Sequence, residues 1–342
     1  MTISKYWEKE TGPRLEGSRS LDSSKLQAPC ITRIPHGGYR LFYTAVGPAR
    51  PFPNCQGYIL SAVSDDGLTF KTEPGIRLAP QPDVPHMSHR VLAPSVTMCD
   101  KGRWRMFFES RGAADQPTVI CSAVSLDMLN WEFEEGIRLQ GIGSLGGPRF
   151  LKFADGSGRL HCFAEKVDKN RSCKTTADII CADTSNGINF EMQTKFGFGQ
   201  VQTEFDSMGI TAAEVIAPTK VDEDYTMVYS EWQDVPAGTV VPLHPSNDPN
   251  ADKKEFAAAS IAADMSGYRS RIYTAYSHDG LVWNQSECII NGSGYGGQGL
   301  DAVHAEDMSL IEISEGVYRM YYAACDKNGK WTIASAITSA CK

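Results

Sequence analysis

The sequence of 342 residues lacks the marks of membrane proteins, exported proteins and nucleic-acid binders. No apolar run reaches the roughly 18 residues of a membrane-spanning helix. The segment from Met1 to Arg19 is polar and charged, without the apolar core of a signal peptide. Acidic residues outnumber basic ones, 41 to 33, and the largest basic cluster is the pair Lys253 and Lys254. We therefore expect no membrane and no nucleic acid as partner, while the oligomeric state stays open.

Cysteine pairs and cofactor motifs are missing as well. None of the ten cysteines forms a C-x-x-C pair, so the usual zinc and thioredoxin spacings are absent. Several cysteines sit in apolar, strand-like runs, which predicts buried free thiols and a cytoplasmic location. There is no Walker sequence, no G-x-G-x-x-G and no G-x-S-x-G. The sequence predicts no cofactor and no metal, with a single calcium ion near His304 and Asp307 as the open alternative.

What the sequence does have is an internal repeat. Its first element reads small-x-Asp-Gly-aliphatic-x-aromatic, with Asn in place of Asp in one copy. Asp-Gly and Asn-Gly supply the left-handed residue of a hairpin turn, and the apolar residues that follow resume a strand. Met128 replaces the glycine in one copy, which predicts a different turn type there. The copies are Ser64–Phe70, Ser125–Trp131, Thr184–Phe190 and Ser277–Trp283.

Two further elements complete each unit. An aromatic-rich strand precedes each turn, at Tyr39–Tyr43, Trp104–Phe108, Leu160–Phe163, Tyr225–Tyr229 and Tyr318–Tyr322. Before it stands an opening element, usually with proline: Ala28–Ile31, Ala93–Val96, Gly147–Phe150, Ala217–Lys220 and Glu306–Ser309. The chain thus holds five units of three or four strands.

These units predict an all-β fold, a five-bladed β-propeller with about four antiparallel strands per blade. A radial arrangement is favoured because no single sheet of this kind can bury both of its faces. We expect one domain over residues 1–342, with blades at about 25–80, 90–140, 145–200, 212–290 and 303–342. The N-terminus would supply the missing outer strand of the last blade. A polar insertion at about 234–267 is expected to be a mobile loop beside the active face.

Candidate site residues follow from this architecture. Innermost strands line the channel of a propeller, so residues before the opening elements and after the aromatic strands should share one face. Lys25, Gln27 and Arg111 occupy such positions. Carboxylates recur among these positions, and glycoside cleavage needs two of them around one cavity. The catalytic candidates are Glu214, Glu306, Asp307, Glu165 and Glu109, and the substrate-binding candidates are His89, Arg90, Arg149, Glu231, Trp232, His304 and Asp326.

With these motifs, nearly the whole chain resembles the five-bladed β-propeller superfamily of arabinanases, levansucrases and invertases, glycoside hydrolase families 43 and 32. The resemblance implies a catalytic base in the first blade, a supporting Asp in the third and an acid Glu in the fourth. Glu214 matches the acid, and we expect it near Glu306 or Asp307. The first and third acids are absent, because the corresponding runs are Gln27–Pro29 and Gly147–Pro148.

The functional hypothesis is a hydrolase or transferase that acts on a small glycoside or oligosaccharide by carboxylate acid-base catalysis. The departures from the family triad keep two alternatives open. One is a cyclase or lyase of specialised metabolism, whose apolar substrate would contact Trp232 and Tyr295. The other is an inactive carbohydrate-binding propeller. A cyclase cavity should be mainly apolar, and a binding module should bury no perturbed acid.

Overall fold

The computed structural model describes residues 6–100, 102–113, 116–141, 143–167, 175–198, 207–220, 223–235, 238–240 and 268–338. Within these ranges the chain forms β-strands and one short 3-10 turn, η1 (Pro85–Met87), so the all-β prediction is confirmed. No helix in this part of the chain is long and apolar enough to cross a membrane. The expected loop at about 234–267 lies almost entirely outside the described residues.

Consecutive strands pair antiparallel in groups. The first group is β3 (Lys25–Arg33), β4 (Tyr39–Val46), β5 (Tyr58–Ser64) and β6 (Lys71–Thr72). The second is β7 (Arg90–Asp100), β8 (Arg103–Arg111), β9 (Val119–Ser125) and β10 (Glu132–Phe133). The third is β11 (Leu145–Lys152), β12 (Gly158–Val167), β13 (Thr175–Thr184) and β14 (Glu191–Met192).

The fourth group is β16 (Ser207–Ile216), β17 (Tyr225–Asp234), β18 (Tyr268–Ser277) and β19 (Val282–Ile290), beside which the short β15 (Gly197–Phe198) pairs in parallel. The fifth is β20 (His304–Ser314), β21 (Val317–Cys325) and β22 (Trp331–Thr338). Single parallel contacts, Ala177 with Gly209 and Ser270 with His304, join groups three to five into one large mixed sheet.

The N-terminal segment completes the fifth group. Its strands β1 (Trp7–Lys9) and β2 (Leu15–Glu16) both pair antiparallel with β22. Glu10, next to β1, accepts hydrogen bonds from Arg319 on β21 and from Ser335 on β22. The two ends of the described chain are therefore held in one sheet.

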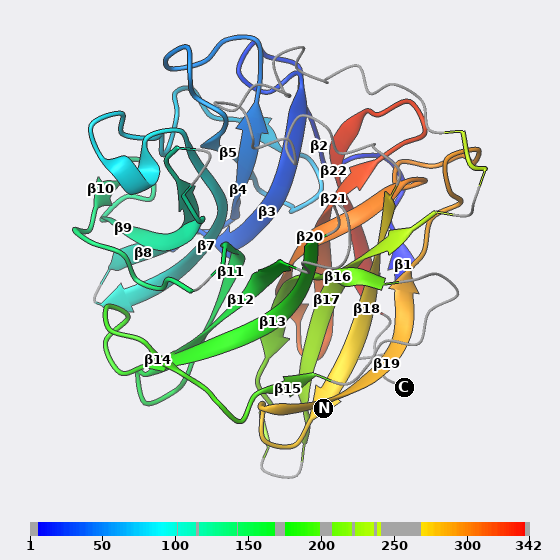
Figure 1. Ribbon diagram of the computed structural model, residues 1–342. Helices are drawn as coiled ribbons and strands as arrows, with labels where there is room; N and C mark the ends of the chain where they lie inside the picture. Colours follow the sequence, from blue (N-terminus) through cyan, green and yellow to red (C-terminus); the bar gives the residue numbers. More distant parts are fainter. Residues whose placement is uncertain are drawn as a thin grey trace.

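The strand groups follow one another around the molecule in chain order (Figure 1). Apolar clusters lie between neighbours: Phe42 of β4 packs in one cluster with Met106 and Phe108 of β8. A further cluster joins the last group to the first, through Tyr321 of β21 and Leu41 of β4. Because each group buries its faces against two neighbours, the core forms a closed ring of clusters.

The repeated turns form as expected in the first copy. Asp66 accepts the backbone N–H groups of Leu68 and Thr69, and Gly67 has a φ of +71°. The prediction for the second copy is wrong. Met128 has a φ of +60°, and Asp127 accepts the same two backbone N–H groups, so the turn type is unchanged. The Met128 side chain is buried in the core, which offsets the strain of a left-handed non-glycine residue.

An arginine of the aromatic strand ties neighbouring groups together. Arg40 binds Glu73 of its own group at 2.8 Å and donates to the carbonyl of Asp127 in the next turn. Three other arginines do the same, each with one carboxylate and one turn carbonyl. They are Arg105 with Glu134 and Asn186, Arg159 with Asp183 and Gly280, and Arg319 with Glu10 and Asp66.

The opening element of the fourth unit is displaced from its expected position. Ala217 and Pro218 lie beyond the end of β16 at Ile216. The irregularity that matches the opening element of the other groups falls instead between Ile210 and Ala212, where no proline marks it. The bulge therefore lies at Thr211, six residues before Ala217, and this decides where Glu214 lies.

The eight cysteines in the described part of the chain are free, as expected. Six of them are buried, and burial raises the pKa of the Cys30 and Cys121 thiols to about 11. These thiols therefore serve as apolar core residues in the thiol form.

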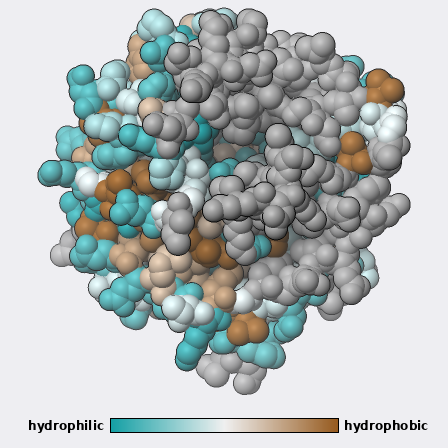
Figure 2. Space-filling view, viewed as in Figure 1, coloured by the Kyte–Doolittle hydropathy of each residue, from teal (hydrophilic) through white to brown (hydrophobic). Residues whose placement is uncertain are grey.

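On the face shown in Figure 2, apolar side chains form small groups among hydrophilic ones.

Candidate active site

The innermost strand of each group is broken by a bulge at the same point. Register shifts fall at Ala28 in β3, Ala93 in β7, Gly147 in β11, Thr211 in β16 and Asp307 in β20. All of these but Thr211 adopt a left-handed φ, between +45° and +54°. Such a conformation is costly for residues other than glycine and is concentrated at functional sites. The bulges aim one residue from every group into a shared cavity.

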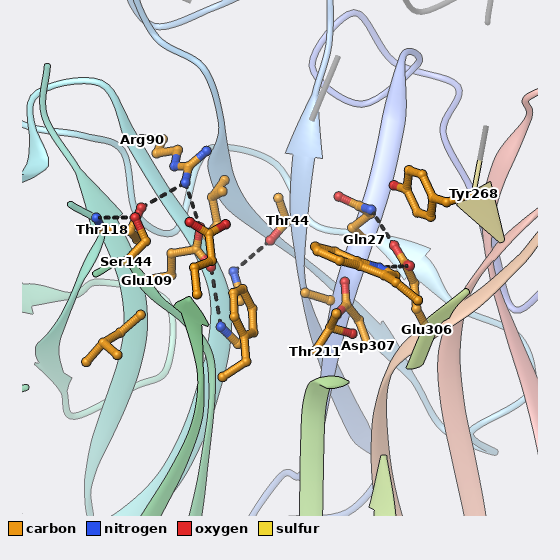
Figure 3. A pocket seen from close by; sticks show the side chains of 18 residues that line it. Gln27, Thr44, Arg90, Glu109, Thr118, Ser144, Thr211, Tyr268, Glu306 and Asp307 are labelled. Carbon is orange, nitrogen blue, oxygen red and sulfur yellow. Dashed lines mark hydrogen bonds and ion pairs between the residues drawn. The ribbon is translucent and has the colours of Figure 1, made fainter. Parts of the chain in front are cut away.

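The cavity lies where the five innermost strands meet, and two walls of it carry the ionisable groups (Figure 3). Glu306 and Asp307 stand on one side, and Glu109 and Arg90 on the other. Glu165 also lines the cavity, and its charge interacts with that of Glu109. The remaining lining is mixed polar and apolar: Gln27, Ala28, Thr44, Leu92, Ala93, Thr118, Ser144, Leu145, Gly147, Phe163, Thr211, Trp232 and Tyr268.

Glu306 is held by donors on both of its oxygens. The Gln27 amide donates to Oε1 at 2.9 Å, and the Trp232 indole donates to Oε2 at 3.0 Å. Burial raises the pKa of Glu306, and the charge of nearby Lys25 opposes that rise. Burial also lowers the pKa of Lys25 to about 7, and its Nζ lies 4.5 Å from the centre of the Trp331 ring.

Asp307 is the carboxyl group that keeps its proton near neutral pH. Burial raises the pKa of Asp307 to about 7, and the neighbouring Glu306 carboxylate adds to the effect. Arg149 opposes both, but more weakly. Glu306 has the hydrogen-bond donors that favour its ionised form, so in this close pair the proton belongs on Asp307.

On the opposite wall, one carboxylate is paired with an arginine. Glu109 lies 3.1 Å from the guanidinium of Arg90 and accepts the backbone N–H of Gly147 at 3.3 Å. The same Nη2 of Arg90 donates to Thr118. Burial raises the pKa of Glu165, and the charge of Glu109 raises it further. Two carboxyl groups in different environments thus line the cavity together with Asp307.

Aromatic rings line the side between Phe163 and Tyr268. The Trp232 ring lies 6.3 Å from Phe163 and 5.7 Å from Tyr268. Behind Tyr268, the ring of His304 stacks on Trp331 at 5.3 Å. This arrangement gives the cavity an apolar platform beside its carboxylates, as ligand sites for partly polar molecules commonly have.

Arg149 fixes the floor of the site. Its guanidinium donates to the carbonyls of Pro29, Pro94, Pro148 and Met308, which follow the bulges of four innermost strands. It also lies 3.4 Å from Glu214 on β16, the fifth. One buried cation therefore links all five innermost strands directly below the cavity.

The structure places the expected site residues in two sets. Glu306, Asp307, Glu109, Glu165, Arg90 and Trp232 line the cavity. Glu214 does not, because the bulge of β16 is at Thr211 and Glu214 lies three residues further along the strand. Its carboxylate pairs with Arg149, and burial raises its pKa while Arg149 opposes the rise.

Four substrate-binding candidates, His89, Asp326, Glu231 and His304, do not line the cavity. His89 contacts Ser88, and Asp326 caps a turn through the N–H groups of Asn328 and Lys330. Glu231 is fully buried. Burial raises the pKa of nearby Tyr229, and the charge of Glu231 raises it further. His304 is packed between Tyr268 and Trp331.

Several lining residues were not expected. Thr44 directly follows the first aromatic strand, so the rule applied to the other units would have found it. Thr118, Ser144, Thr211 and Tyr268 carry no repeat signal in the sequence. Among the described residues, no group of three His, Cys, Asp or Glu side chains could hold a metal ion.

No protein-family model and no curated protein matches the sequence. Solved structures do match its fold. One described as a glycoside hydrolase is 14% identical with a TM-score of 0.66, over 98% of this chain and 93% of that one. An endo-arabinase from Bacteroides thetaiotaomicron is 15% identical, with a TM-score of 0.57 over 95% and 98% of the two chains.

An N-acetylgalactosamine deacetylase from F. plautii, solved with blood group B trisaccharide, is 13% identical, with a TM-score of 0.60 over 98% and 95%. At these identities the likeness shows the fold and not the reaction. The chain has the fold of the propeller glycoside hydrolases, which confirms the resemblance drawn from its repeats. A fold of this kind hosts more than one activity, so function has to be argued from the site.

Proposed function

We propose that this protein is a five-bladed β-propeller enzyme that cleaves a small glycoside or oligosaccharide, with Asp307 as general acid and Glu109 as the ionised carboxylate. Each strand group corresponds to one blade, with β1 completing the last. The observation that carries the proposal is the contrast between the two cavity walls. Asp307 has a pKa raised to about 7 by burial and by Glu306, whereas Glu109 is bonded to Arg90 and a backbone N–H. Glycoside cleavage needs one carboxyl group that donates a proton and a second that accepts one or attacks, and the two walls offer carboxyl groups in different environments.

The reaction divides between these walls. Asp307 gives its proton to the glycosidic oxygen, and the bond from that oxygen to the anomeric carbon breaks. Glu109 takes a proton from the attacking water, whose oxygen forms the new bond to the anomeric carbon. The products are the free sugar and the leaving alcohol, and the proton on Glu109 returns through solvent to Asp307. Glu306 sets the pKa of Asp307 and stays ionised through the bonds from Gln27 and Trp232.

The lining supports a sugar over the alternatives. Hydroxyl and amide groups of Gln27, Thr44, Thr118, Ser144 and Thr211 surround the cavity, which is the lining expected for a polyol. The cavity of a cyclase for an apolar substrate should instead be mainly apolar. A binding module has no need of a carboxyl group whose pKa is raised to about 7. The free thiols support a reducing compartment, in keeping with a cytoplasmic enzyme.

The test is a screen of the purified protein against nitrophenyl glycosides and short oligosaccharides, followed by variants at the two walls. Asp307→Asn and Glu109→Gln keep the side-chain shapes and remove the transferable proton or the charge. Each should lower turnover by about 10²–10⁴-fold, the usual loss for an acid or base.

Glu134→Gln is the matched control, because it removes a part-buried carboxylate that pairs with Arg105 outside the cavity. It should keep turnover within a small factor of wild type. The proposal fails if no glycoside in the screen is cleaved, or if the Asp307 and Glu109 variants turn over as fast as the control.

A further inference from the structure

Two arginines stand side by side near Glu109, and one of them, Arg90, lines the cavity. Arg90 on β7 and Arg111 on β8 are direct cross-strand partners. Side chains at such positions lie on the same face of the sheet, and like charges placed there repel each other. Arg90 is 6% exposed and Arg111 8%, so water screens this repulsion poorly. A buried pair of like charges is not a feature that the fold requires.

Their hydrogen-bond donors are incompletely used. One nitrogen of Arg90, Nη2, binds Glu109 and Thr118, as Figure 3 shows. Within the described part of the chain, Nε of Arg90 and both Nε and Nη2 of Arg111 are buried without a hydrogen-bond partner. Buried donors are almost always paired in native proteins, so three unpaired guanidinium nitrogens in one place indicate a missing acceptor.

The two arginines adjoin carboxylates that line the cavity. Side chains alternate along a strand, so Arg111 lies on the same face of β8 as Glu109, two residues nearer the strand end. Arg90 and Glu109 both line the cavity. Burial and the charge of Arg90 lower the pKa of Arg111 to about 10, and Glu109 and Glu165 oppose this effect. Arg111 therefore stays charged at neutral pH.

We propose that Arg90 and Arg111 form a subsite for a carboxylate on the substrate, so that the enzyme acts on an acidic saccharide such as a uronide. A guanidinium fork binds a carboxylate through two parallel N–H···O bonds, and two forks side by side offer the three free donors to one planar anion. The statement that the acidic saccharide is cleaved rests on the proposed function. The statement that a carboxylate binds here rests on the unpaired donors of the two arginines.

The first experiment measures binding and needs no turnover. Isothermal titration calorimetry compares the methyl glycosides of glucuronic and galacturonic acid with those of glucose and galactose. At least one uronide should bind about 10- to 100-fold more tightly than its neutral partner, the range for charge-assisted hydrogen bonds. Inorganic sulfate and phosphate are titrated in parallel, and both should bind more weakly than that uronide.

The preference should depend on Arg111. Arg111→Gln should bring the two affinities to within about threefold of each other, and Arg111→Lys, which keeps the charge but loses the fork, should leave part of the preference. Arg138→Gln is the matched control, since Arg138 is equally buried at 8% but bonds to loop carbonyls outside the cavity. Thermal unfolding of each variant verifies that it is folded.

The subsite proposal is overturned if no uronide binds better than its neutral partner, if Arg111→Gln keeps the preference, or if sulfate binds as tightly as the uronides. These outcomes separate it from the proposed function. If uronides bind in a way that depends on Arg111 but no glycoside is cleaved, the subsite proposal is supported and the proposed function is contradicted. If neutral glycosides are cleaved and Arg111→Gln has no effect, the proposed function is supported and the subsite proposal is contradicted.

Discussion

The side-chain contacts repeat at the turn end of the strand groups but vary at their cavity end. At the turn end, four arginines make the same pair of contacts, one to a carboxylate and one to a turn carbonyl, as Arg40 does with Glu73 and Asp127. At the cavity end, the backbone again repeats, but the side chains at the bulges do not. Ala28, Ala93 and Gly147 are small, whereas Asp307 presents a carboxyl group from the same left-handed position.

The difference separates what folds the chain from what gives it chemistry. The turn end is uniform because every group must join its neighbour in the same way. The cavity end needs only a bulge, so its side chains are free to differ from one group to the next. A half-buried carboxyl group in a left-handed backbone at one such position has no folding role that alanine does not fill elsewhere, which supports the proposal that it is functional.

The largest structural effect should come from Arg149, the residue at the cavity end on which all five groups depend. Arg149→Met leaves Glu214 without its partner and removes the donor from the carbonyls of Pro29, Pro94 and Met308. Breaking a buried ion pair from one side costs about 3–5 kcal/mol of unfolding free energy. Urea denaturation measures the loss. Adding Glu214→Gln to Arg149→Met should restore part of it, and a loss of under about 1 kcal/mol would mean that Arg149 does not hold the strands together.

A smaller effect of opposite sign should come from relieving the bulge itself. Ala93 has a φ of +51°, and its small side chain is buried among few apolar neighbours. Ala93→Gly should raise the unfolding free energy by about 1 kcal/mol, because glycine accepts a left-handed conformation without the steric cost. The same urea titration measures it. An equal or lower stability would show that the bulge is not strained.

The sequence predicts the repeating parts of this molecule well and the exceptions poorly. Turn residues, aromatic strands and an N-terminal strand follow from local patterns, and they lead to Glu109, Glu165, Glu306 and Asp307 through their places in the repeat. The expected position of Glu214 beside the cavity was wrong because Ala217-Pro218 has the sequence of an opening element, while the bulge lies at Thr211 and has no proline. The role of Arg149 was out of reach, since its partners lie in five separate strands.

The central claim is that Asp307, unlike the residues at the other four bulges, carries a carboxyl group that keeps its proton near neutral pH. One measurement tests this claim without a substrate. The pKa of Asp307 is raised from the ordinary value of 3.8 to about 7 by burial and by Glu306. Between these two values the folded protein binds more protons at this position than the unfolded chain does. The unfolding free energy of wild type should therefore fall, relative to Asp307→Asn, as pH rises through that window.

Urea denaturation of both proteins from pH 4 to pH 9, about the range in which the group titrates, gives this difference directly. The account predicts that the advantage of Asp307→Asn grows from about pH 4 to about pH 7 and is constant above it. A difference that does not change over this range would show that Asp307 has an ordinary pKa, and would contradict its role as the general acid.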